Sequence, residues 1–224
     1  MNVKISTVII GSIDIDVDAL KKIEGVTVFK VTDRKSCDEI IGQVSDNDVV
    51  FIISDGREVY YAEKFFARIK PLKIFLVTEA QAADNKNLRD VLIQLPAQDF
   101  KRKAYEVTNM INDMVNVEGL VGLDFADVKS VLKNSGQAVA TIGEGKNLDE
   151  TVNNALEGHD IKSSRAVLIN FKATKDAASM AEFESAIEKI KSSVNKNAEI
   201  IWGLTVDESF GDKVKVAVIA TKFI

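Results

Sequence analysis

The sequence of 224 residues has few of the residue types that build metal and redox sites, with a single cysteine and a single histidine. The lone Cys37 excludes a disulfide within this sequence, and His159 has no His or Cys partner near it, so we expect no metal site. No apolar run approaches the roughly 20 residues that span a bilayer. The first residues, MNVKISTVII, lack a basic region before a long apolar run, so we predict no signal peptide and a cytoplasmic protein.

The sequence also has no excess of positive charge, because its 29 Lys and Arg are outnumbered by 34 Asp and Glu, for a net charge of −5. Such a chain has no broad electrostatic attraction for nucleic acid or for an anionic membrane, so we expect neither as a partner. Hydrophobic residues make up 46% of the sequence and charged residues 28%, proportions typical of a globular protein with a buried core. The length allows one large domain or two small ones.

Strand-like and helix-like segments alternate over the first part of the chain. The strand-like runs are β-branched and apolar with little alternation, which is typical of a parallel sheet covered on both faces. They lie at 3–11, 26–32, 49–54 and 73–80, with helical patterns at 37–45 and 57–70. This alternation predicts an α/β fold that begins with a Rossmann-like parallel sheet domain at residues 1–97.

A long helical pattern after Pro96 predicts a central connecting helix at residues 98–118, and the remaining residues, 119–224, form a predicted α+β domain. We predict that the last two strands pair as an antiparallel hairpin through residues 209–212, with one face of the final strand exposed. The predicted helices are 124–134, 148–157 and 179–194, and the predicted strands are 138–143, 165–173, 200–208 and 213–221.

The most specific motif is GLVGLDFADVKSVLKNSG, residues 119–136. It resembles the loop and helix with which FtsZ, the bacterial tubulin homologue, activates GTP hydrolysis in the next subunit of its filament. The resemblance implies that Asp124 and Asp127 act in trans on a partner's nucleotide, and that Gly119, Gly122 and Phe125 belong to the same interface. The residues that match the usual loop pattern are Gly119, Leu120, Asp124, Phe125, Ala126, Asp127 and Val128, whereas the family's asparagine is replaced by Gly122.

The end of the chain carries two further stretches of the same resemblance. QAVATIGEGKNLDETVNNAL, residues 137–156, is similar to a strand, glycine turn and helix of the family. The final segment matches the family's closing pattern at Gly203, Asp207, Asp212, Val214, Val216, Val218, Ile219, Ala220 and Thr221. The chain is therefore identified as a divergent member of the FtsZ/tubulin superfamily with an FtsZ-type C-terminal activation domain.

The glycine-rich loops that hold the phosphates in that family are not found. Glycines let backbone N–H groups approach a phosphate closely, but the first loop has only Gly11, and SDGREVYYAEKFF has only Gly56. Asp14, Asp16 and Asp18 near the first loop would repel phosphate unless a divalent ion intervened. The pair of Asn and Asp that reads guanine in the family is also missing, since the nearest positions hold Arg102, Ala104 and Tyr105.

Three functions remain open. The first is a cell-division-related protein that does not bind or hydrolyse GTP and docks its activation-domain face, head to tail, on an FtsZ-type protein or on itself. The second is a divergent, filament-forming FtsZ homologue with GTP and magnesium as cofactors, hence a GTPase. The third is a ligand-binding or scaffold protein with a site at the carboxyl ends of its strands, near Ser12, Thr32, Asp55 and Glu79.

Two groups of residues have more than one interpretation. Asp124 and Asp127 are either a helix cap with a solvated first-turn acid, an interface without catalysis, or groups that assist hydrolysis. The densest aromatic cluster is either the core of a helix or an apolar patch for a partner, and consists of Tyr60, Tyr61, Phe65 and Phe66.

Overall fold

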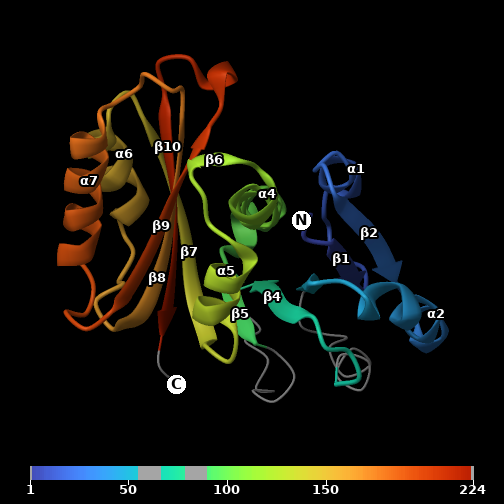
Figure 1. Ribbon diagram of the computed structural model, residues 1–224. Helices are drawn as coiled ribbons and strands as arrows, with labels where there is room; N and C mark the ends of the chain where they lie inside the picture. The colour runs from blue at the N-terminus through green and yellow to red at the C-terminus, as the bar shows by residue number, and fades with distance from the viewer. Residues whose placement is uncertain (1, 55–66, 79–89, 223–224) are drawn as a thin grey trace. The chain divides into compact units, whose positions relative to one another are not determined.

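The computed structural model describes residues 2–54, 67–78 and 90–222 (Figure 1). The chain divides into two compact units, which we describe separately. The first comprises Met1–Asn112 with Leu132–Gly136, and the second comprises Asp113–Val131 with Gln137–Ile224. The predicted fold class is confirmed: a parallel α/β sheet, a central helix and an α+β C-terminal part. The predicted domain bounds at residues 97 and 118 stay a prediction.

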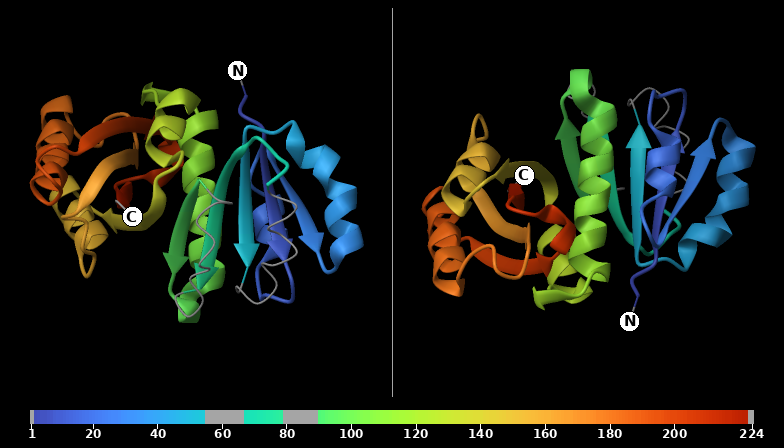
Figure 2. Two further views of the ribbon diagram at one scale, coloured as in Figure 1. Left: turned by 90° about the horizontal axis from the view of Figure 1, so that it is seen from below. Right: turned by 90° about the horizontal axis from the view of Figure 1, so that it is seen from above.

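The first unit is built on a parallel sheet with the strand order β2-β1-β3-β4-β5. Neighbouring strands lie side by side in both views of Figure 2. The strands are β1 (Ile5–Ile10), β2 (Val26–Val31), β3 (Val49–Ser54), β4 (Leu72–Thr78) and β5 (Val91–Leu95). The helices are α1 (Val17–Lys21), α2 (Arg34–Ser45) and the first part of α4 (Phe100–Asn116), which follows the short 3₁₀ helix η2 (Ala97–Asp99).

The sheet is covered on both faces, as the apolar runs predict, because every residue of β1 and β3 is buried. Helix α2 supplies Cys37, Ile40 and Val44 to the core on one face. Its start is fixed by a capping box in which the Ser36 amide donates to the Asp33 carboxylate at 2.8 Å. Burial raises the pKa of the Cys37 thiol, so this side chain is a neutral packing residue rather than a reactive thiolate.

Three short elements of the structure were not predicted: α1, β5 and β6 (Gly119–Val121). The longest of them has five residues, too few to establish a helical or alternating period. The predicted helix at 57–70 and the aromatic cluster around Tyr60 lie almost wholly outside the described residues.

The second unit contains a mixed sheet with the order β7-β10-β8-β9-β6. The prediction that the last two strands form a hairpin is wrong, because β8 lies between them, parallel to β9 and antiparallel to β10. The connection crosses the end of β8, where the Asp207 amide donates to the Ala173 carbonyl at 2.9 Å. The elements are β7 (Gly136–Gly145), β8 (Ser164–Ala173), β9 (Glu199–Val206), the 3₁₀ helix η3 (Glu208–Phe210), β10 (Val214–Lys222), α5 (Phe125–Leu132), α6 (Leu148–Leu156) and α7 (Met180–Ser192).

The prediction of an exposed face on the last strand is also wrong. Strand β10 is inserted between β7 and β8, and its residues from Val216 to Thr221 are buried on both faces. Lys215 is only partly buried and forms an ion pair with Glu144 of β7 at 3.0 Å. The alternation of lysine and valine in the sequence therefore marks one end of the strand and not its whole length.

Helices α6 and α7 cover the same face of this sheet (Figure 1). Their apolar residues meet alternate residues of β8 and β10 in one core, in which the rings of Phe171 and Phe183 pack edge to face with centroids 5.3 Å apart. Asn147 caps α6, and Ser179 with Glu182 forms a capping box at α7. Among the described helices, none has the length and apolarity that a membrane crossing requires.

The close approach of β7 to α6 predicts a steric test of the core. We expect Gly143→Ala to lower the free energy of unfolding by roughly 1–3 kcal/mol, as overpacking does, because an added Cβ would lie 2.5 Å from the amide nitrogen of Ala155. The matched control is Gly42→Ala in α2, where an added Cβ meets nothing within 4 Å. The control should gain about 0.5–1 kcal/mol through helix propensity. Urea unfolding measures both variants, and equal midpoints would contradict tight packing at Gly143.

Candidate functional site

The motif at residues 119–136 begins with the edge strand β6, whose backbone lies very close to the neighbouring strand β9. In β6, Gly119 pairs with Thr205 of β9, and an added Cβ on Gly119 would lie 2.5 Å from the Leu204 carbonyl oxygen. On β9, an added Cβ on Gly203 would lie 2.8 Å from Leu123 Cγ. Both glycines are therefore required by the close approach of two chain segments rather than by an unusual φ angle. They hold the start of the motif on the sheet.

The two aspartates of the motif bind each other's backbone at the start of α5. The Asp127 amide donates to Asp124 Oδ1 at 2.8 Å, and the Asp124 amide donates to Asp127 Oδ2 at 3.1 Å. This reciprocal arrangement has the logic of a capping box, in which two orphan N–H groups of the first helical turn gain acceptors. The predicted cap by Asp124 is thus present, and these two bonds use one oxygen of each carboxylate.

Exposed apolar side chains and a glycine with free space around it lie near these acids in the sequence. The side chain of Leu120 is 57% exposed, and an added Cβ on Gly122 would meet nothing within 4 Å. Phe125 is partly exposed, with the Lys129 ammonium 5.5 Å from its ring centroid. We name residues 119–127 the loop face. All the predicted site residues lie on it: Gly119, Gly122, Asp124, Phe125 and Asp127.

An ion triad that the sequence reasoning missed lies just before the loop face. Lys172 of β8 places its ammonium 3.2 Å from a carboxylate oxygen of Asp113 on α4 and 3.1 Å from one of Asp207. The Phe210 ring centroid lies 5.5 Å from the same ammonium. The only signal in the sequence is Asn170 and Lys172 at alternate positions near the end of a mainly apolar strand, which indicates that this part of one face of β8 is polar.

Burial and pairing act in opposite directions on the triad. Burial raises the pKa of Asp113, and the attraction of Lys172 opposes this shift only in part. Burial also disfavours the charged form of Lys172, but Asp113 and Asp207 together outweigh it and raise the lysine pKa. Hydrogen bonds from Ser209 and Lys172 lower the pKa of Asp207. The geometry thus places one ammonium group between two carboxyl groups.

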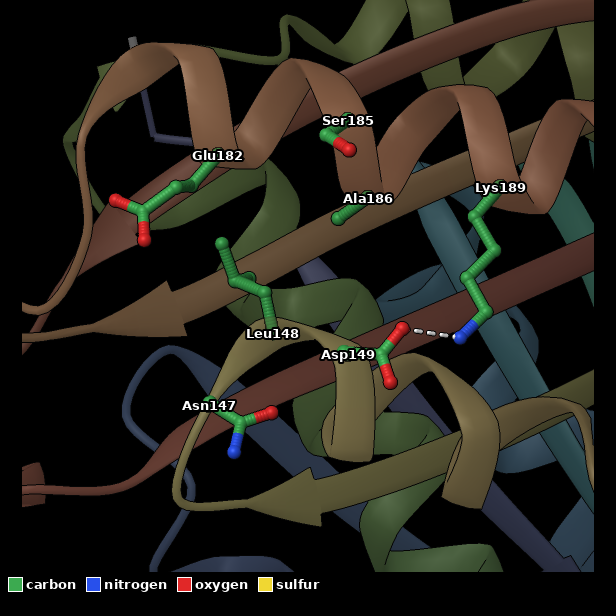
Figure 3. Close-up of a pocket in the computed structure, with 7 residues that line it drawn as sticks. All are labelled: Asn147, Leu148, Asp149, Glu182, Ser185, Ala186 and Lys189. Atoms are coloured by element: carbon green, nitrogen blue, oxygen red, sulfur yellow. Dashed lines mark hydrogen bonds and ion pairs between the residues drawn. The ribbon is translucent and has the colours of Figure 1, made fainter.

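A groove of about 260 Å³ lies between the start of α6 and the side of α7 that faces it (Figure 3). Its charged groups already have partners, since Lys189 bonds to Asp149 and Glu182 accepts from the Ser179 amide. The bond from Lys189 lowers the pKa of Asp149. The lining residues are Asn147, Leu148, Asp149, Glu182, Ser185, Ala186 and Lys189. The charged groups of this groove are thus engaged in pairs, and the pKa shifts of Asp149 and Glu182 are downward, which keeps both carboxylates ionised rather than poised to act as acids.

The first loop of the parallel sheet, where the family resemblance places phosphate, binds its own chain. Gly11 adopts a φ of 80°, and its amide donates to the Val31 carbonyl at 2.9 Å. Asp16 caps α1 by accepting from the Ala19 amide at 2.9 Å, and Asp14 pairs with Lys101 at 3.4 Å. Ser12 and Thr32 are exposed, whereas Gly56, Asp55 and Glu79 lie outside the described residues.

The family model that describes the FtsZ family C-terminal domain matches residues 136–224. The cell division protein FtsZ of Porphyromonas gingivalis is 33% identical over 153 residues, which cover 62% of this chain and 33% of that protein. FtsZ of Magnetospirillum gryphiswaldense is 27% identical over 233 residues, covering 84% of this chain and 41% of that protein. The chain thus spans between a third and a half of the length of such relatives.

Solved structures extend the likeness to nearly the whole chain. An FtsZ W319Y mutant from M. jannaschii has a TM-score of 0.82 at 21% identity, and covers 99% of this chain and 92% of its own. CetZ2 from Haloferax volcanii, in a GTPγS-bound protofilament, has a TM-score of 0.67 at 10% identity, covering 97% and 93%. At these identities the likeness establishes the fold.

The close approach of β6 to β9 predicts different tolerances at the two glycines of the loop face. Gly119→Ala should lower the free energy of unfolding by roughly 1–3 kcal/mol, because the new methyl group would be pressed against the Leu204 carbonyl. Gly122→Ala should change it by no more than about 0.5 kcal/mol. Urea titration gives the two values. A neutral Gly119→Ala variant would show that β6 is not held on the sheet in solution.

Proposed function

We propose that this member of the FtsZ/tubulin superfamily is a cytoplasmic, cell-division-related protein. It docks its loop face on an FtsZ-type partner and does not itself bind or hydrolyse GTP. The proposal rests on one observation above all. Reciprocal hydrogen bonds hold exposed Asp124 and partly exposed Asp127 together at the start of α5, shortly after strand β6, which approaches β9 closely at Gly119.

This geometry suits a face that meets a nucleotide held by another subunit. Each carboxylate uses one oxygen in the reciprocal cap, so its other oxygen points to a role in binding water or a cation near a partner's phosphates. Leu120 and Phe125 beside the acids supply apolar contact area. The acids either promote hydrolysis or only complete the contact, and the partner's rate of GTP hydrolysis distinguishes these two roles.

The first loop supports the absence of GTP binding. A phosphate at this position would need free backbone N–H groups, but the Gly11 amide already has a backbone acceptor and the start of α1 already has a carboxylate. The aspartates at positions 14, 16 and 18 would add repulsion. A subunit with an intact loop face and no nucleotide would join only one end of a head-to-tail filament, and would cap it there.

A divergent, GTP-dependent filament-former is the second candidate. The observation that favours it is the likeness over almost the full chain to CetZ2, whose structure is a GTPγS-bound protofilament. The two candidates differ in whether the chain itself binds GTP.

We predict that replacing both acids of the loop face, Asp124→Asn with Asp127→Asn, weakens docking on FtsZ of the same organism by about tenfold or more, or roughly 1.4 kcal/mol. Asparagine keeps the oxygen that accepts the capping bond, so the helix should persist while the charge is lost. The matched control is Asp149→Asn, another exposed first-turn acid, on α6. Co-sedimentation with FtsZ filaments and the FtsZ GTPase rate are the measurements.

The wild-type chain sets the reference in that experiment. If it neither co-sediments with FtsZ nor alters FtsZ GTP turnover, the docking function is wrong. If the double variant docks as tightly as the wild type, docking occurs through another surface.

The two candidates are separated by isothermal titration of the purified chain with GTP and magnesium. We expect no binding heat up to millimolar GTP, because the Gly11 amide and the Ala19 amide already donate to acceptors within the chain. FtsZ titrated under the same conditions is the positive control. Binding with a dissociation constant in the micromolar range would instead establish the GTP-dependent filament-former.

A further inference from the structure

The ion triad links three segments that converge on the loop face. Asp113 lies one turn before the end of α4, Lys172 lies near the end of β8, and Asp207 precedes η3. Lys172 also pairs in register with Thr205, which pairs in register with Gly119. Lys172 therefore lies in register, across β9, with Gly119, the residue at which the loop face begins.

We propose that Lys172 is a positioning residue for the loop face: by holding Asp113 and Asp207 together, it fixes the point at which the chain leaves α4 and enters β6. The proposal rests on the docking function proposed above, because it concerns how the docking surface is held in place.

The connection that the triad controls is very short. The last helical bond of α4 runs from the Val117 amide to the Asp113 carbonyl at 3.2 Å, and β6 begins at Gly119. Val117 is 41% exposed and Glu118 is exposed, so neither anchors the connection by burial. One side of the connection is held by Asp113 through Lys172, and the other is held by the pairing of Gly119 with Thr205.

Neighbouring hydrogen bonds fix the orientation of the groups around Lys172. Asp207 receives the lysine on one oxygen, while its other oxygen accepts from the Ser209 amide at 3.0 Å, so the carboxylate is held in one orientation. Asn170 donates to the Thr205 hydroxyl at 3.2 Å, which fixes Thr205 in the same part of the sheet. A partly buried cation with two oriented carboxylates tolerates little displacement, because any shift leaves a desolvated charge unpaired.

The test uses the full chain with Lys172→Met, Lys172→Arg and the matched control Lys215→Met. Lys215 occupies the paired position on β10 and is also partly buried, but it forms its ion pair with Glu144 and acts on Asp113 only at longer range and more weakly than Lys172. Hydrogen exchange of the isolated chain reports on amides 117–124, and amides of α6 and α7 report on general stability. Docking on FtsZ is measured for the same variants. Asp113→Asn, which removes one arm of the triad, replaces Lys172→Met if that variant does not fold.

We expect Lys172→Met to speed exchange at residues 117–124 by roughly tenfold and to leave α6 and α7 unchanged. FtsZ docking should weaken by a similar factor, Lys172→Arg should restore both properties, and Lys215→Met should alter neither. Uniformly faster exchange throughout the second unit would overturn the proposal, because it would indicate a purely structural role. The same local change in Lys215→Met would overturn it as well.

The docking data separate this inference from the function on which it rests. If the wild-type chain does not bind FtsZ, the proposed function fails, and a positioning role toward docking fails with it. If the wild type binds and Lys172→Met binds equally tightly, the docking function stands and only the positioning role of Lys172 is wrong.

Discussion

The close backbone approach of β6 to β9 is the constraint on which the rest of the loop face depends. A methyl group on Gly119 would collide with a carbonyl oxygen, and one on Gly203 would collide with Leu123, so no other residue allows the two segments to lie as they do. Once β6 is held there, α5 has to start within a few residues, and the capping bonds between Asp124 and Asp127 define where. Two acids are thus fixed at the surface without belonging to a rigid core.

The sheet beneath the loop face has two different surfaces. One is apolar and packs against α6 and α7 in a single buried cluster, which stabilises the second unit through the hydrophobic effect. The other carries Asn170, Lys172 and Lys215, each with a polar partner. A partly buried ion pair contributes little net stability, since desolvation offsets most of its attraction. Its value is geometric, because hydrophobic contacts tolerate sliding whereas an oriented carboxylate does not.

The sequence predicted these features unevenly. Capping by Asp124 followed from a local pattern, and the parallel strands followed from apolar runs, so both were recognisable within a few residues. The position of β8 between β9 and β10 was not, because a short turn between two strands favours a hairpin and the actual crossover depends on contacts with β8. The triad joins Asp113 to Lys172 across 59 positions, which no local pattern reports. The aromatic cluster and the second glycine loop fall outside the described residues.

The charges at the two ends of the proposed contact favour a different chain over a second copy as the partner. Head-to-tail self-association would bring Asp124 and Asp127 toward a first loop that carries Asp14, Asp16 and Asp18, of which Lys101 offsets only one. Without a bound nucleotide and its magnesium, such a junction sets carboxylates against carboxylates, which costs free energy at any separation within the screening length. An FtsZ-type partner that holds GTP and magnesium presents a cation to the same acids. If the chain does not bind GTP, as we propose, the acids of its first loop also disfavour a homopolymer.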